Sequence, residues 1–126
     1  MKEDKQMVVS IVLFAIAAVG GLTMAVMRLR GRDLPPIGLA LLHGLVAAVA
    51  LILLIVAVVG ASAGSAAAST AAIVALVGFI VAALGGFFVF SFHLRKKALP
   101  IPPMIVHALV AVASFLVLLV VVLRMR

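Results

Sequence analysis

The fold is decided by one pattern that occurs twice, as GGLTMAVMRLRGRDLPPIGLALLHGL at residues 20–45 and GGFFVFSFHLRKKALPIPPMIVHAL at residues 85–109. Each copy reads as the end of an apolar helix, a short basic turn, proline, and the start of a returning apolar helix. Proline suits the first turn of a helix because the N–H that it lacks has no partner there. Each copy also places one histidine, His43 or His107, inside the returning helix. The pattern therefore predicts two similar helical hairpins.

The composition is that of a membrane protein. Of the 126 residues, 68% are hydrophobic and 10% are charged, whereas about a quarter of a soluble chain is charged. A spanning helix needs about 20 apolar residues, so the chain has room for a bundle of four spans. We expect these spans at residues 7–29, 37–59, 70–92 and 103–123. The prediction is one all-α integral membrane domain over residues 1–126, an up-down-up-down four-helix transmembrane bundle.

The repeat is parallel, with copies at about residues 7–59 and 70–123. Each copy contributes two spans, so the second begins on the same side of the membrane as the first. His43 and His107 consequently lie on helices that run in the same direction. At 1.5 Å per residue, each histidine should lie about 6–10 Å inside its span from the basic turn.

The ten Lys and Arg residues lie at span ends, not along one exposed face, so nucleic-acid binding is not indicated. Six of them flank the two basic turns: Arg28, Arg30, Arg32, Arg95, Lys96 and Lys97. The positive-inside rule then places both basic turns in the cytoplasm and both termini outside. We expect a bacterial-type inner (plasma) membrane.

Three further expectations concern the loops. Asp33 is placed to serve the N-terminus of the second span, as a cap or as a charge that the helix dipole favours. The uncharged segment 60–69 has small residues and no apolar anchor, which indicates a flexible external loop. Its start could equally continue the second span. His93 occupies the position that corresponds to Arg28, and we expect it at the membrane interface.

The two histidines should belong to one layer across the bundle. Gly21 lies seven residues before Arg28 and Gly86 seven before His93, which is again about 10 Å of depth. The pairs Gly20–Gly21 and Gly85–Gly86 should therefore face the level of His43 and His107. Two helices offer side chains that bind, and two offer bare backbone that makes room.

Small residues continue this layer along the histidine helices, with Ala47 and Ala111 each four residues after a histidine. In an up-down-up-down bundle these two helices are diagonal. With neighbouring axes 8–10 Å apart, the diagonal is roughly 12–14 Å, a width that suits an imidazole–iron–imidazole unit and keeps the histidines from touching easily. A flat ligand there could place carboxylates against basic side chains of the turns. The residues expected to do so are Arg30, Arg32, Arg95, Lys96 and Lys97.

These residues resemble the haem-binding core of membrane b-type cytochromes. In cytochrome b and in transmembrane ferric-reductase-type cytochromes, alternate helices supply paired histidines, and half of a haem A synthase has a comparable plan. The resemblance implies axial ligation of one haem b by His43 and His107, with the glycine pairs allowing close approach. It implies one-electron transfer with a quinone or a redox partner protein. Cytochrome b itself carries four ligand histidines and two haems, whereas the outer half of this bundle has no histidine.

Other interpretations remain open at this point. The histidines can be structural or proton-handling, or can hold another metal, although a catalytic zinc site needs three protein ligands. The glycines can serve ordinary helix packing. The chain can accordingly be a cofactor-free accessory subunit of a larger membrane complex, or a small transporter. It carries no recognisable enzyme motif, and its acidic residues Glu3, Asp4 and Asp33 lie outside the spans, so an electron-transfer protein or subunit is favoured over a stand-alone enzyme. Besides the lipid bilayer, copies of itself or a larger complex are possible partners.

Overall fold

The computed structural model describes residues 2–126, and all of its long elements are α-helices. Over these residues it contains four α-helices and one short 3-10 helix, η1 (Ala66–Ala68). The α-helices are α1 (Lys2–Leu29), α2 (Ile37–Val59), α3 (Thr70–Leu94) and α4 (Ile101–Leu123). Each is long and apolar enough to cross a membrane. The predicted all-α four-helix architecture is confirmed, and the protein is an integral membrane protein.

The observed helix bounds agree with the predicted spans except at polar ends. The bounds of α2 are those predicted, α4 begins two residues earlier, and α3 ends two residues later. The largest difference is at α1, which begins at Lys2. Its first turn carries Glu3 and Asp4, and acidic side chains there are favoured by the helix dipole. Hydropathy finds the apolar part of a helix and omits such a polar first turn.

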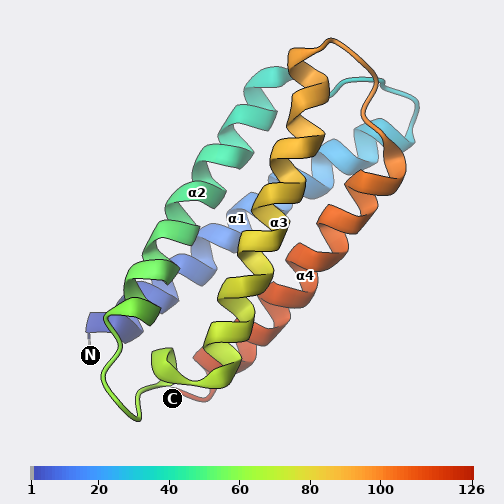
Figure 1. Cartoon of the computed structure of the whole chain (residues 1–126). Coiled ribbons are helices and arrows are strands. Elements are labelled where there is room, and N and C mark those ends of the chain that lie inside the picture. The colour runs from blue at the N-terminus through green and yellow to red at the C-terminus, as the bar shows by residue number, and fades with distance from the viewer. Residues whose placement is uncertain (1) are drawn as a thin grey trace.

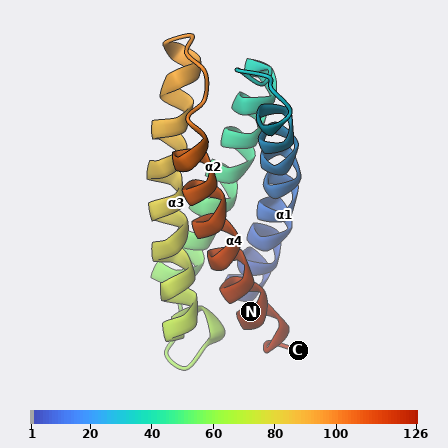
Figure 2. The ribbon, with the colours of Figure 1, turned by 90° about the vertical axis from the view of Figure 1, so that its right-hand side faces the viewer.

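The four helices alternate in direction and form two hairpins (Figures 1 and 2). Within residues 2–126, α1 packs along α2 and α3 along α4, and the hairpins meet through α1–α4 and α2–α3. No close backbone approach joins α1 to α3 or α2 to α4, so these are the diagonal pairs. The two basic turns lie together at one end, and both termini lie at the other end with the loop that connects α2 to α3.

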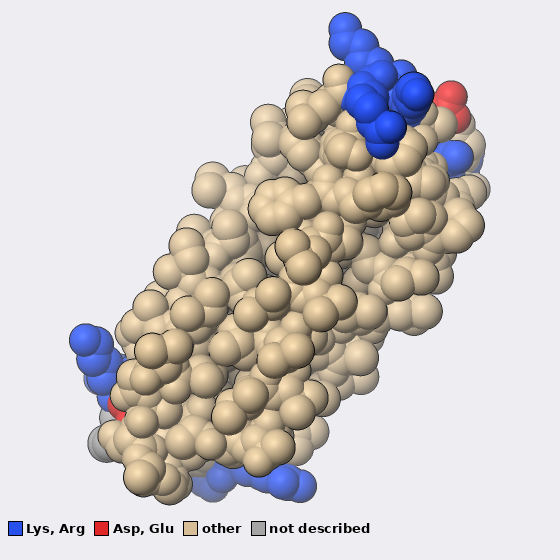
Figure 3. Space-filling view, viewed as in Figure 1, with Lys and Arg blue, Asp and Glu red and all other residues tan. Residues whose placement is uncertain are grey.

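Charged side chains gather at the two ends of the molecule. In the face shown by Figure 3, Lys, Arg, Asp and Glu lie at the ends, and the surface between them carries none of these residues. Many large apolar side chains of the molecule are exposed, among them Val19, Leu22, Leu84 and Leu109 at 64–68%. Such a surface is stable only against lipid or other apolar helices.

The large apolar side chains of the core occupy the half of the bundle nearer the termini. Its main members are Met7, Leu54 and Leu118, all with no exposed surface. Phe14 of α1 and Phe79 of α3 stack across the bundle, with ring centroids 3.7 Å apart and planes 3° apart. Beyond this pair, toward the basic turns, the inner side of the bundle is built mainly from Gly, Ala and His.

Asp33 does not cap α2, because the N-cap of this helix is Pro36, without any side-chain cap bond. The alternative role of its charge near the helix N-terminus stays a prediction. Asp33 accepts a backbone hydrogen bond from Leu99 through its carbonyl, at 3.0 Å. This bond joins the two basic turns, and a main-chain contact of this kind leaves no trace in residue type.

The connection at residues 60–69 is not an unanchored loop. It contains η1, in which Ala67 is fully buried against the core. Ser69 caps α3, because its hydroxyl accepts a hydrogen bond from the N–H of Ala72 at 3.1 Å. A small side chain can be buried as completely as a large one, so the lack of an apolar anchor in the sequence was misleading.

Candidate functional site

The imidazole of each membrane histidine is fixed by a helix of its own hairpin. His43 Nδ1 lies 2.7 Å from the carbonyl oxygen of Ala17 on α1, and His107 Nδ1 lies 2.8 Å from that of Ala82 on α3. A carbonyl only accepts hydrogen bonds, so each Nδ1 carries the proton and donates it. The neutral ring then presents Nε2 with a free lone pair. Over residues 2–126 neither Nε2 has a hydrogen-bond partner.

The two sites are equivalent in the repeat. Ala17 and Ala82 stand at corresponding positions of the two copies, 65 residues apart, and are 4% and 5% exposed. A bond from Nδ1 to a backbone carbonyl is also the usual second partner of a metal-bound imidazole, because it fixes the tautomer and the ring direction. The tautomer and the direction of both rings are therefore fixed in the same way.

The histidine rings lie in an edge contact across the diagonal from α2 to α4. Their centroids are 6.3 Å apart and their planes cross at 83°. The expectation that the two histidines do not touch easily is therefore wrong. It considered the distance between helix axes and not the reach of the two side chains.

The glycine pairs lie against the histidines of their own hairpins. A Cβ on Gly21 would be 3.0 Å from His43 Cε1, and one on Gly86 would be 3.0 Å from His107 Cε1. On Gly20 and Gly85 the nearest atom is the Cβ of the same histidine, at 3.7 Å in both cases. The expected layer of glycines and histidines is present, and the imidazole rings themselves occupy the room that the glycines leave.

Small side chains continue the layer on both sides of the histidines. Ala47 and Ala111 are half-buried, and on α2 and α4 they lie between the histidines and the buried Ala50 and Ser114. Toward the turns, Met104 is 6% exposed. Ala47, Ala111 and Met104 thus leave space or flexible contacts beside the imidazoles, whereas Pro103 and Val110 line the outer side of His107.

His93, in the last turn of α3, is buried. It is 8% exposed, and its Nε2 lies 3.2 Å from the carbonyl oxygen of Pro35 in the other hairpin. The ring also stacks near Phe90, with centroids 5.6 Å apart. His93 is buried because the turn of the other hairpin lies over it. Hydropathy along the sequence does not reveal such a long-range contact.

The sequence interpretation missed a role for Arg28. Its Nε donates a hydrogen bond of 2.8 Å to the carbonyl oxygen of Leu99, in the second basic turn. Arg28 and His93 hold corresponding positions in the two copies, and each reaches a carbonyl of the opposite hairpin. That correspondence was visible in the sequence and is the signal that could have identified the pair.

The five basic residues expected to meet ligand carboxylates all lie exposed in the turns. Arg95 is held locally, with its Nη2 3.1 Å from Ser91 Oγ and its guanidinium 4.2 Å from the centre of the Phe92 ring. Arg32 donates to the nearby carbonyl oxygen of Leu34 at 3.1 Å. Arg30, Lys96 and Lys97 complete this exposed set. None of the hydrogen bonds found for these side chains within residues 2–126 points into the histidine layer.

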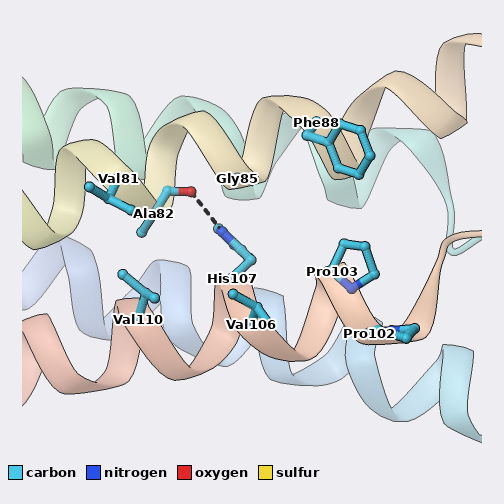
Figure 4. A pocket seen from close by; sticks show the side chains of 9 residues that line it. All are labelled: Val81, Ala82, Gly85, Phe88, Pro102, Pro103, Val106, His107 and Val110. Carbon is cyan, nitrogen blue, oxygen red and sulfur yellow. Dashed lines mark hydrogen bonds between the residues drawn. The ribbon is translucent and has the colours of Figure 1, made fainter.

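An apolar groove of about 500 Å³ lies between α3 and α4, and His107 forms part of its lining (Figure 4). Figure 4 shows the ring of His107 directed toward α3 and bonded to Ala82, with Phe88 and Pro103 closer to the turn. The volume lies in the range of small-molecule sites. His107 is half-buried, so a lipid-soluble molecule in this groove would contact its ring.

Two histidines alone suit a metal ion whose other ligands come from a cofactor. Within residues 2–126 no group of three or more His, Cys, Asp or Glu side chains lies close enough to hold a metal ion. If both Nε2 atoms bound one metal ion at about 2.0–2.1 Å, with roughly 1 Å from ring nitrogen to centroid, the centroids would be about 6 Å apart. The observed centroid separation is 6.3 Å, and ligation would require each Nε2, which lies near Gly21 or Gly86, to turn toward the metal. Two axial imidazoles are what a haem iron requires from the protein, so the residues present fit this group.

A scan against known protein families and searches of characterised proteins and solved structures find no match to this chain. The functional assignment therefore depends on the chain's own residues and their geometry.

Proposed function

We propose that the protein is a membrane b-type cytochrome that binds one haem b between His43 and His107. The observation that carries this proposal is the separation of 6.3 Å between two imidazoles whose Nδ1 atoms are both bonded to carbonyls. Among the described residues, both imidazoles leave Nε2 without a hydrogen-bond partner and lie at one level on facing helices, as axial ligands of one iron would.

The chemistry supplied by the bound haem is one-electron oxidation and reduction of its iron. The chain's own contribution is to fix the two imidazoles. The hydrogen bonds to Ala17 and Ala82 keep each ring in one tautomer and raise its basicity as a ligand. Burial among apolar helices excludes water from the layer.

The redox partner is proposed to be a quinone or a redox protein. The groove between α3 and α4 supports a quinone, because a lipid-soluble ring in it would touch His107 directly. We place the basic turns in the cytoplasm of a bacterial-type inner membrane and the termini outside, since positively charged turns are retained on the cytoplasmic side.

The proposal is tested by titrating the purified, detergent-solubilised protein with haem b and recording absorption spectra. We expect one haem per chain with the spectrum of a six-coordinate, low-spin b-type haem. His43→Ala and His107→Ala should each lose that spectrum. His93→Ala is the matched control and should keep it at saturating haem, because His93 is not an axial ligand.

Two results would contradict the proposal. One is a wild-type protein that binds no haem under these conditions, which would favour a cofactor-free accessory subunit or a transporter. The other is a low-spin spectrum that survives removal of both His43 and His107.

A further inference from the structure

Basic side chains stand at one equivalent position in the two copies of the repeat. Arg28 lies near the end of α1 and His93 near the end of α3, each seven residues beyond the glycine that touches a membrane histidine. Seven residues of helix rise about 10 Å. Arg28 and His93 therefore lie between the histidine layer and the two basic turns.

Each of these side chains crosses to the other hairpin. Arg28 Nε donates to the carbonyl oxygen of Leu99, and His93 Nε2 donates to that of Pro35. Both acceptors immediately precede the N-cap proline of a returning helix, Pro100 or Pro36. The reciprocal bonds hold the two basic groups inside the end of the bundle, whereas the other cations of the turns are exposed.

Both groups retain unused hydrogen-bonding capacity. His93 Nδ1 is buried, and no hydrogen-bond partner for it exists among the described residues. The guanidinium of Arg28 has five donors, and the one bond found for it within residues 2–126 uses only Nε. The free guanidinium donors of Arg28 favour a ligand that brings acceptors, and His93 Nδ1 becomes a second donor to such a ligand in the imidazolium form, in which both ring nitrogens donate.

The direction in which such a ligand would extend follows from the histidine pair. The line from His43 to His107 follows the diagonal from α2 to α4, so a flat ring perpendicular to that line extends along the bundle axis and toward α1 and α3. Two acidic groups on the turn-facing edge of the ring would then spread toward α1 and α3. Arg28 is the inward-reaching basic group on α1, and His93 is the one on α3.

We propose that Arg28 and His93 form a paired carboxylate site that binds the two propionates of the haem, one on each side. This site rests on the proposed function and replaces the exposed turn cations as the propionate partners. His93 uses Nε2–H for Pro35 and, as the imidazolium, donates Nδ1–H to a carboxylate. Arg28 keeps Nε on Leu99 and donates from its terminal nitrogens, which suit a carboxylate.

The test compares haem b with its dimethyl ester, in which both carboxylates are blocked, on the full-length protein in detergent. Dissociation constants are measured for wild type, Arg28→Gln and His93→Gln, with Arg30→Gln as a control on an exposed neighbour. We expect each of the first two substitutions to weaken binding of haem b about 10-fold, because a charge-assisted hydrogen bond contributes roughly one tenfold step. Their effect on the ester should be near zero, and Arg30→Gln should change neither constant.

The comparison separates a binding role from a structural one. An equal loss for haem b and for its ester would mean that Arg28 and His93 only hold the hairpins together, and would overturn the paired site while leaving the cytochrome proposal intact. Binding of the ester to wild type as tightly as haem b would overturn it as well. Failure of wild type to bind either compound would overturn both proposals.

Discussion

Alanine at Gly21 and alanine at Gly20 should have different effects, although the two positions are adjacent on α1. The new Cβ at residue 21 would be 3.0 Å from His43 Cε1 and 3.4 Å from its Nδ1, whereas the Cβ at residue 20 would be 3.7 Å from His43 Cβ. The first contact is too close and the second is ordinary. The ring of His43 must therefore shift in Gly21→Ala only.

The size of the effect follows from what holds that ring. A shift stretches the 2.7 Å bond from Nδ1 to Ala17, and a hydrogen bond between membrane helices contributes about 0.6–1.7 kcal/mol. An off-rotamer side chain costs about 0.5–1.5 kcal/mol more. Replacing helical glycine by alanine gains about 1 kcal/mol at either position, so this gain cancels in the comparison. We expect Gly21→Ala to be about 1–2 kcal/mol less stable than Gly20→Ala.

The assay is reversible unfolding in mixed detergent micelles, followed by circular dichroism, with haem affinity measured on the same samples. Gly86→Ala and Gly85→Ala repeat the comparison in the second hairpin, where the distances are again 3.0 and 3.7 Å. Haem binding should weaken only in the variants at residues 21 and 86. Stabilities within 0.5 kcal/mol of each other in both pairs, with unchanged haem affinity, would refute the proposed close fit between glycine and histidine.

Three further predictions concern the rest of the bundle. Ser10→Ala removes the fully buried hydrogen bond of 2.8 Å from Ser10 Oγ to the carbonyl oxygen of Ala50, and it should lower the free energy of unfolding by about 1 kcal/mol. The control is Thr23→Ala, because the Thr23 hydroxyl is exposed and bonds within its own helix. This control should change the free energy of unfolding by less than 0.5 kcal/mol. Phe14→Ala and Phe79→Ala should each cost about 3 kcal/mol, and a double-mutant cycle should show coupling of about 1 kcal/mol from their stacking; additive losses would contradict the stacked pair. Gly31 has a φ of +101°, so Gly31→Ala should destabilise the first basic turn by about 1 kcal/mol. Gly38→Ala, at a helical position with open space around it, should not be destabilising. Equal effects of the two substitutions on the free energy of unfolding would count against this turn geometry.

The sequence predicted the fold well because hydropathy and charge dominate in a membrane. The span at 37–59 agrees with α2 at both ends, since Pro36 and Gly60 bound a run that is apolar except for His43. The start of α1 was less accurate, because Lys2 and its polar neighbours belong to a helix but not to an apolar segment.

The site was predictable in its depth and its members but not in its contacts. Counting residues from proline and glycine placed His43 and His107 in one layer with the glycine pairs, and the structure brings them together. The approach of the two rings could not be predicted, since it depends on side-chain direction. The burial of His93 depends on a turn of the other hairpin, 58 residues away at Pro35, and no local pattern encodes such a contact.

The central claim, that His43 and His107 hold one haem between them, is tested most directly by the reduced-minus-oxidised absorption spectrum of the purified protein. Wild type and a double variant, His43→Ala with His107→Ala, are compared after identical haem supplementation. We predict the sharp α band of a six-coordinate b-type haem in wild type and its complete loss in the double variant. A wild-type spectrum without that band, or a double variant that retains it, would contradict the claim.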